Sequence, residues 1–220
     1  MDDVYIVGLG MTPFGKYSDL SVRNLTESAV TAALDDAGGE VDDIGAAFFG
    51  NTSQGALEGQ FMVRGEMALR DLKFKNIPVI NVENACATAS TAFHQAVTHI
   101  RAGESDVALA VGAEKMYFED KERVFGIFDG AWDVHDRAGT YDLLKGIAAG
   151  CDVPEEALAS QANQKSLFMD VYAFLTRYHM EKFGTTQRQL AAVASKNHFH
   201  SSLNPLSQFR HDMSVDEVMA

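Results

Sequence analysis

The stretch IPVINVENACATASTAFHQAVTHIR, residues 77–101, contains a short apolar run followed directly by an amphipathic pattern. The run from Ile77 to Val82 is typical of a buried strand. Small and apolar residues then recur at helical spacing as far as Ile100, and Arg101 and Gly103 are typical of a helix end. The stretch therefore predicts a strand that passes directly into a helix, as in the repeating unit of a parallel α/β sheet.

Cys86 lies at the junction of this strand and helix, and Asn84 is suited to be the helix N-cap. The unpaired backbone N–H groups of a first helical turn, together with the helix dipole, favour an anion such as a thiolate. A small residue buried between helix and strand is the alternative, because free cysteines are often buried. From position alone, both interpretations stay open.

The rest of the chain repeats the alternation of strand and helix. A helix is expected from the N-cap Ser21 to Gly38, and a looser one near residues 62–72. Beyond Met116, charge and glycine interrupt the pattern to about Ser160, and helices then dominate. The four expected strands are Val4–Leu9, Ile44–Phe49, Ile77–Val82 and Val107–Val111. This order predicts an α/β protein with a mostly parallel sheet and a helical subdomain.

Composition narrows the class of protein. The 220 residues are 46% hydrophobic, which is ordinary for a globular chain, and the formal net charge is −13. Such a charge argues against a nucleic-acid-binding or anionic-membrane surface. The two cysteines, Cys86 and Cys151, suit a reducing compartment and form no metal-binding spacing. Because no signal peptide is visible and no apolar run approaches about 18 residues, we expect a cytoplasmic protein without a membrane span.

Other motifs are weaker. Gly8 and Gly10 follow the first expected strand as in a dinucleotide-binding loop, but Pro13 replaces the third glycine. His198 and His200 have the spacing of a metal pair on a strand, yet they fall near a helix end, so we expect no metal. His94 lies about 12 Å along the helix from Cys86, which is too far for a general base.

Several segments together resemble the thiolase superfamily, and most closely its sterol-carrier or lipid-transfer branch. The nucleophile motif is matched by Cys86–Ser90 (CATAS), and the strand end that follows by Gly112–Met116 (GAEKM). The resemblance continues through the segments 178–186, 196–198 and 204–210. Ala89 departs from the family, which has glycine there, and its methyl group would crowd the catalytic loop or the acyl pocket.

The resemblance implies a fold and a domain division. It assigns residues 1–116 to a thiolase-like N-terminal βαβαβαβ half and residues 117–220 to an inserted helical loop subdomain. Family members complete their site with a histidine and a second cysteine or histidine from a C-terminal catalytic half. Those motifs are absent from this sequence, so we expect a fragment or a split subunit that is inactive in isolation.

The resemblance also implies a mechanism. Cys86 would accept an acyl group from a coenzyme A thioester, and its backbone N–H would help to stabilise the oxyanion. Met169 is the expected lining residue for the pantetheine or acyl chain. Coenzyme A enters as substrate, so no bound cofactor is expected.

Three functions stay open at this point. The first is an acyltransferase of the acetyl-CoA acetyltransferase type, acting in lipid metabolism. The second is a thiolase-like lyase that cleaves lipid or sterol side chains by retro-aldol chemistry, with a zinc-ribbon and OB-fold partner. The third is a non-catalytic half that serves as a subunit. In each case, the family implies a homodimer or tetramer that pairs through residues 77–82.

Overall fold

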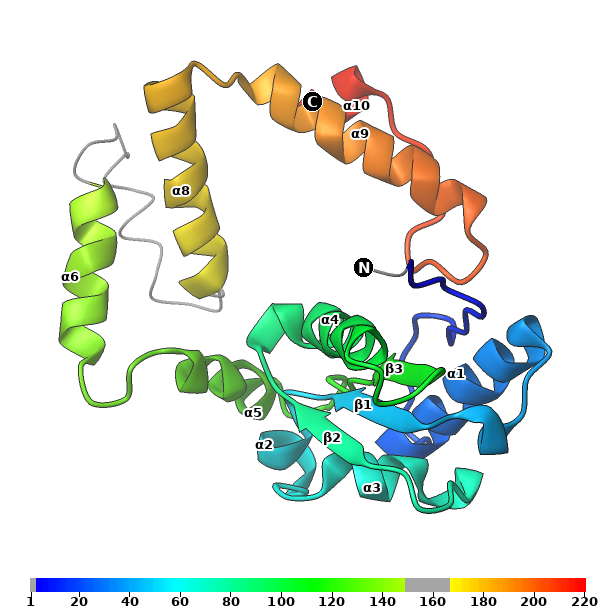
Figure 1. Cartoon of the computed structure of the whole chain (residues 1–220). Helices are drawn as coiled ribbons and strands as arrows, with labels where there is room; N and C mark the ends of the chain where they lie inside the picture. The colour runs from blue at the N-terminus through cyan, green and yellow to red at the C-terminus, as the bar shows by residue number, and fades with distance from the viewer. Residues whose placement is uncertain (1–2, 149–166) are drawn as a thin grey trace. The chain divides into compact units, whose positions relative to one another are not determined.

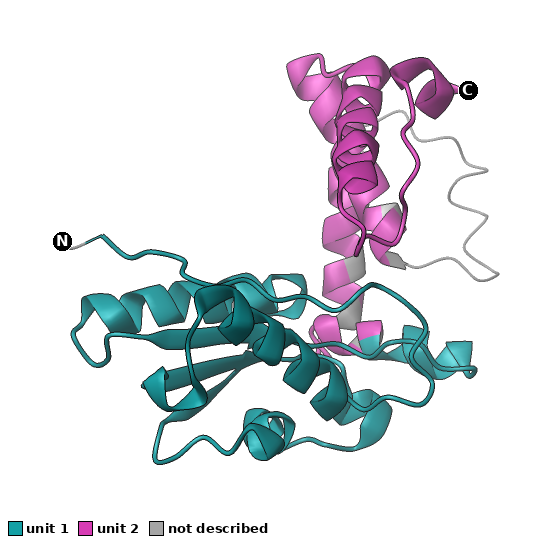
Figure 2. Cartoon of the chain, turned by 90° about the vertical axis from the view of Figure 1, so that its right-hand side faces the viewer, with its two compact units in different colours: residues 1–127 teal, residues 128–220 magenta. Residues whose placement is uncertain are grey.

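The computed structural model describes residues 3–148 and 167–220, and the chain divides into two compact units (Figure 2). Unit 1 is Met1–Ile127 and unit 2 is Phe128–Ala220. The division at residues 116 and 117 that the sequence predicts follows a family pattern and stays a prediction.

Unit 1 is built on a parallel sheet of three strands, β1 (Ala46–Gly50), β2 (Val79–Val82) and β3 (Ala108–Gly112), in the order β2-β1-β3 (Figure 1). Both neighbours pair parallel to the central strand β1. The predicted α/β class with a parallel sheet is thereby confirmed.

The central strand β1 has the sequence AAFFG. It is apolar throughout because the strand is buried along its whole length. Ala47 and Phe49 pack on one side into a cluster with residues of α1 (Val22–Ala37) and α3 (Arg64–Leu69). Phe48 packs on the other side against α4 (Thr88–Arg101). The sheet therefore has helices on both faces, as alternation along a strand requires.

Local signals place the helices of unit 1 where the sequence predicts them. Ser21 caps α1 in a reciprocal capping box with Asn24, and Gly38 ends the helix in the left-handed conformation with φ 63°. The looser helix near residues 62–72 is α3 followed by the 3₁₀ turn η2 (Arg70–Leu72). The other short elements of this unit are η1 (Val41–Asp43), α2 (Gln54–Glu58) and α5 (Lys121–Gly126).

The prediction that residues 4–9 form the first strand of the sheet is wrong. The segment has no regular secondary structure and pairs with none of the described strands, and Tyr5 is 75% exposed. It lies instead against α1: a Cβ added at Gly8 would come within 2.2 Å of the Ala33 carbonyl oxygen, and one at Gly10 within 1.9 Å of the Ala29 carbonyl oxygen. The two glycines therefore serve close packing on a helix.

Unit 2 is helical in its described part. Its elements are η4 (Ile127–Ala131, beginning in unit 1), α6 (Arg137–Ala148), α8 (Leu167–Phe183), α9 (Gln187–Leu203) and α10 (Val215–Met219). The expected capping box of Thr186 and Gln189 is present at the start of α9. Helices also occur before Ser160, where the sequence shows no clear period. No helix among the described residues is long and apolar enough to cross a bilayer.

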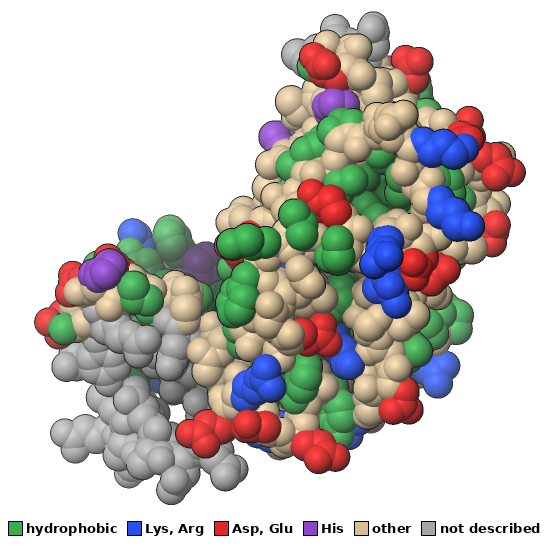
Figure 3. Space-filling view, turned by 90° about the horizontal axis from the view of Figure 1, so that it is seen from below, with side chains coloured by type: hydrophobic (Ala, Val, Ile, Leu, Met, Phe, Trp, Pro, Cys, Tyr) green, Lys and Arg blue, Asp and Glu red, His purple; other side chains and the backbone are tan. Residues whose placement is uncertain are grey.

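Charge is mixed on the face of the molecule seen in Figure 3, where acidic, basic and apolar side chains are interspersed. That face therefore presents no broad surface of one sign.

Candidate active site

Polar residues gather where the three parallel strands end. Thr26, Asn51, Ser53 and Thr88 are the buried polar side chains of the described residues, and the last three lie at this edge. Asn51 and Ser53 follow β1, Glu83 follows β2, and Glu114 lies just after β3. Because the carboxyl ends of parallel strands form the usual ligand-binding edge of an α/β sheet, this edge is the candidate site.

Cys86 lies at this edge on the 3₁₀ turn η3 (Ala85–Ala87), and its thiol is free and exposed. Asn84 occupies the predicted N-cap position, but of η3 rather than of an α-helix, and its side chain makes no capping hydrogen bond; α4 begins only at Thr88. The Asn84 side chain instead donates to Thr91 Oγ1 at 2.9 Å. Thr88 Oγ1 accepts from the Asn84 backbone N–H at 2.8 Å, and neither η3 nor α4 has a side-chain cap.

The residue before Cys86 adopts an uncommon conformation. Ala85 has φ 45°, in the left-handed region, which costs about 1–2 kcal/mol for an L-residue. Its N–H donates to Glu83 Oε1 at 2.7 Å, and its carbonyl accepts from Thr88 Oγ1 at 2.7 Å. Hydrogen bonds on both sides therefore hold the turn in this conformation.

The backbone N–H of Cys86 is oriented by the same turn. Among the described residues, no recorded hydrogen bond engages this N–H, whereas the N–H groups of Asn84, Ala85 and Ala87 are all engaged. It is thus able to donate to an oxyanion formed on a group bound to the thiol.

Asn51 joins the ends of two strands. Its side chain is 1% exposed, and Nδ2 donates to the Ala113 carbonyl at 2.7 Å. Its Oδ1 accepts from the Gln54 N–H at 3.0 Å and from Arg64 Nη1 at 3.2 Å. The amide therefore uses both of its ends to fix the edge of the sheet beside Cys86.

The sequence analysis assigned no role to Asn51, Thr52 or Glu114. The available signal was their position directly after the second and fourth expected strands, since residues after parallel strands meet at one edge. It was weak, because which strands are neighbours is not visible in the sequence.

Ala89, the departure from the family pattern, lies beside β3. A Cβ added at Gly112 would be 2.8 Å from the Ala89 Cβ, so the alanine methyl group rests over the bare backbone of Gly112. The methyl group therefore occupies space close to the end of β3, and Gly112 accommodates it.

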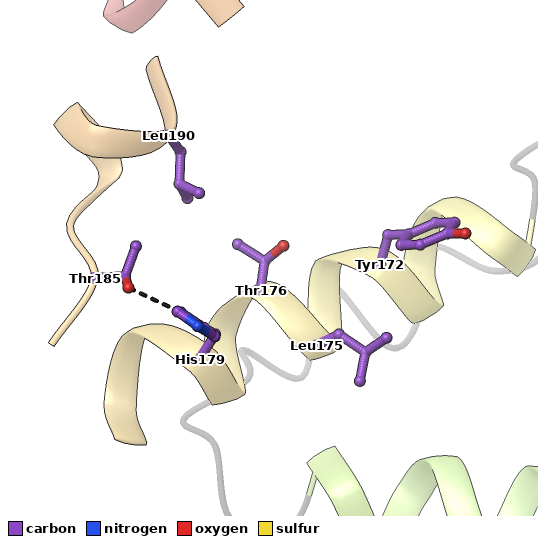
Figure 4. A pocket seen from close by; sticks show the side chains of 6 residues that line it. All are labelled: Tyr172, Leu175, Thr176, His179, Thr185 and Leu190. Atoms are coloured by element: carbon purple, nitrogen blue, oxygen red, sulfur yellow. Dashed lines mark hydrogen bonds between the residues drawn. The ribbon is translucent and has the colours of Figure 1, made fainter. Parts of the chain in front are cut away.

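Unit 2 contains an open cavity of about 250 Å³ between α8 and α9 (Figure 4). Its lining residues are Tyr172, Leu175, Thr176, His179, Thr185 and Leu190. His179 Nδ1 and Thr185 Oγ1 are 2.8 Å apart. Met169 lies on α8, three residues before Tyr172, is 65% exposed and is outside the lining set.

Within residues 3–148 and 167–220, no group of three His, Cys, Asp or Glu side chains has a metal-binding arrangement. His198 lies beside His211, with ring centroids 5.1 Å apart, rather than pairing with His200. In the same part of the chain, no histidine is hydrogen-bonded to Cys86. Cys151 lies outside the described residues.

Comparison with known protein families identifies one match that covers almost the whole chain. The thiolase N-terminal domain family matches residues 4–217. An acetyl-CoA acetyltransferase of Methanothermobacter thermautotrophicus is 32% identical over 219 residues, which are 100% of this chain and 50% of that protein. A non-specific lipid-transfer protein-like 2 of Caenorhabditis elegans is 34% identical, over 98% of this chain and 48% of that protein.

The chain thus spans about half the length of these curated relatives. Among solved structures, the "Ltp2-ChsH2(DUF35) aldolase" has a TM-score of 0.62 and 21% identity, covering 96% of this chain and 47% of that chain. This likeness extends the shared fold through both units.

Proposed function

The chain belongs to the thiolase family, and from this premise we propose that it carries the nucleophile of an acyl-CoA acyltransferase of the acetyl-CoA acetyltransferase type. The observation that carries the proposal is the exposed Cys86 thiol on a hydrogen-bonded turn at the carboxyl edge of the sheet. A cysteine retained only for packing would be buried, as free cysteines commonly are.

The proposed chemistry begins with the thiolate. Cys86 Sγ attacks the carbonyl carbon of the acyl-CoA thioester, and the carbonyl oxygen becomes an oxyanion that accepts a hydrogen bond from the Cys86 N–H. The bond between this carbon and the coenzyme A sulfur then breaks. Coenzyme A leaves as a thiolate and takes a proton from solvent, and the acyl group remains on Cys86 as a new thioester.

The second step transfers this acyl group to an acceptor, and it needs a general acid and base. We assign neither role to a described histidine, because none is hydrogen-bonded to Cys86. The chain binds no other cofactor in this scheme, since coenzyme A is consumed as substrate.

Met169 is the proposed contact for the pantetheine or acyl chain. It lies on α8 at helical spacing from Tyr172 and Thr176, which line the cavity of unit 2, so the three side chains share one side of the helix. We expect Met169→Ala to slow acyl loading from a long-chain acyl-CoA more than from acetyl-CoA. The matched control is Met219→Ala, on α10, which should change neither rate.

The experiment on the whole proposal measures covalent loading. The purified chain is incubated with acetyl-CoA, and its intact mass is determined with and without Cys86→Ser. We expect one acetyl group per chain, lost in Cys86→Ser and retained in Cys151→Ser. Absence of an adduct on the wild-type chain, or an adduct that survives Cys86→Ser, would refute the acyl-enzyme.

The retro-aldol lyase is the alternative that the same experiment separates, because that reaction needs no acyl transfer to the thiol. The aldolase-named structure bears on the fold alone at 21% identity, so it does not favour this alternative. A zinc-ribbon and OB-fold partner belongs to the lyase alternative alone, whereas a cytoplasmic homodimer or tetramer is proposed with either reaction.

A further inference from the structure

Glu114 accepts hydrogen bonds from all three residues that follow β1. Its Oε1 accepts from the Thr52 N–H at 2.5 Å. Its Oε2 accepts from the N–H of Ser53 at 3.1 Å, from the Ser53 hydroxyl and from Asn51 Nδ2 at 3.3 Å. Hydrogen bonds to a carboxylate are stronger than those between neutral groups. The carboxylate therefore holds the loop 51–53 against the end of β3.

Thr52 connects this loop to the turn that carries Cys86. Its Oγ1 is 2.9 Å from Thr88 Oγ1, which in turn donates to the Ala85 carbonyl at 2.7 Å. Thr52 Oγ1 also lies 3.3 Å from the Ala85 carbonyl oxygen and 3.3 Å from Glu83 Oε1, so all of its hydrogen-bonding neighbours belong to the same turn. The backbone and the side chain of Thr52 thus link Glu114 to the strained residue before Cys86.

Resting on the acyl-transfer role proposed for Cys86, we infer that Glu114 is a positioning residue for this thiol. No hydrogen bond among the described residues joins Glu114 to Cys86, so its effect passes through Thr52 and Thr88. It holds the left-handed conformation of Ala85, and with it the direction of the Cys86 side chain and N–H.

The charge of Glu114 and its hydrogen bonds to the loop should have opposite effects on the reaction rate of Cys86, so an experiment can separate them. A carboxylate near a thiol disfavours the thiolate. Removing the Glu114 charge would therefore speed the reaction of Cys86 if the carboxylate acted by charge alone. Removing it would slow the reaction if the carboxylate acts by holding the turn.

The test measures the rate of alkylation of Cys86 by iodoacetamide at neutral pH, in the Cys151→Ser chain. We expect Glu114→Gln and the shorter Glu114→Asp both to slow it about fivefold, the effect of about one net hydrogen bond. Charge alone predicts a faster reaction for Glu114→Gln and no change for Glu114→Asp. The matched control is Glu119→Gln, which removes an exposed carboxylate five residues further along and should leave the rate unchanged.

The Thr52 variants test the path itself. Thr52→Val, which lacks the hydroxyl, should slow alkylation by the same factor, and Thr52→Ser should restore the wild-type rate. The double variant Glu114→Gln/Thr52→Val should be no slower than either single variant, because both break one chain. Thermal unfolding of each variant shows that it is folded. If Glu114→Gln fails to fold, the alkylation rates of Glu114→Asp, Thr52→Val and Thr52→Ser test the inference.

A wild-type rate in Glu114→Asp, or independent effects of the Glu114 and Thr52 changes, would overturn the inference. Alkylation requires no acyl-CoA, so the result is separate from the proposed function. A chain that shows this alkylation pattern but takes no acetyl group would refute the acyltransferase and leave Glu114 as a positioning residue. If the wild-type chain takes the acetyl group but the variants are alkylated at the wild-type rate, the positioning role of Glu114 is refuted and the acyltransferase proposal stands.

Discussion

The turn that carries Cys86 depends on a few hydrogen bonds that hold Ala85 in the left-handed region. The cost of that conformation is about 1–2 kcal/mol, which is close to the net worth of one or two hydrogen bonds. Glu83 and Thr88 supply two hydrogen bonds to Ala85, at 2.7 Å each. The balance is narrow, so single substitutions in this network should alter the reactivity of Cys86 before they affect the stability of the fold.

Cys86 is expected to be the more reactive of the two cysteines. It lies on η3, which runs directly into α4, and a helix N-terminus favours an anion, whereas Cys151 directly precedes Asp152, whose charge disfavours one. The folded chain is labelled with a limiting thiol reagent near neutral pH, and the modified peptide is identified by mass spectrometry. Cys86 should be modified first, and preferential modification of Cys151 contradicts this expectation.

Single elements differ in how far they depend on long-range contacts. α1, α9 and α10 begin with capping boxes whose partners are three residues apart, so their starts are locally determined. β2 and β3 depend on β1, and each is an edge strand of the described sheet. The starts of these helices should therefore be sensitive to changes in their capping residues, and β2 and β3 to changes in β1.

α10 is expected to lose stability in acid. Ser214 donates to the Glu217 carboxylate from its hydroxyl at 2.7 Å and its N–H at 2.8 Å, and these bonds hold the pKa of Glu217 below its usual value. A lowered folded-state pKa means that the stabilisation is present above the unfolded pKa and is lost as the pH falls through the folded pKa.

Cα chemical shifts of residues 215–219, followed by NMR from neutral to acidic pH, measure this loss. Helical shifts should decline in the wild-type chain, whereas Glu217→Gln, which keeps one acceptor oxygen, should show little dependence on pH. Equal pH dependence in the two chains would show that Glu217 is not responsible.

β2 is expected to promote association of the chain. In the described sheet it pairs only with β1, so its other edge has backbone groups available to a second chain. Light scattering of the purified chain at micromolar concentration should detect dimers or larger species that dissociate on dilution. A stable monomer across that range would count against pairing through residues 77–82.

The described part of the chain brings the proposed nucleophile, Cys86, together with a hydrogen-bonded network but with no histidine bonded to its thiol. A positioned general acid or base contributes about 10²- to 10⁴-fold and must lie within about 3 Å of the proton that it transfers. No described histidine is hydrogen-bonded to Cys86, so acylation and turnover should be separable in this chain.

The isolated chain is therefore expected to take one acyl group without turning over. Incubation with a short ketoacyl-CoA and free coenzyme A should give at most a single Cys86-dependent adduct and no accumulation of cleaved product. The control is Cys86→Ser, which should give neither. Repeated cleavage by the wild-type chain would mean that one of its own histidines serves as the base.

Features that depend only on neighbours along the chain could be predicted from the sequence. The capping residues Ser21 and Thr186, the strand-to-helix junction at Cys86 and the family motifs were all visible there. Each involves residues within a few positions of one another, so local chemistry is sufficient to specify it.

The order of the strands in the sheet, by contrast, is visible only in the folded chain. The order β2-β1-β3 brings Asn51, Thr52 and Glu114 to the Cys86 turn, although Thr52 and Glu114 are 62 positions apart. The segment 4–9 has the apolar pattern of a strand, yet it packs along α1 without pairing with the described sheet. A strand is defined by its hydrogen-bonding partner, and that partner is a property of the folded chain rather than of the local sequence.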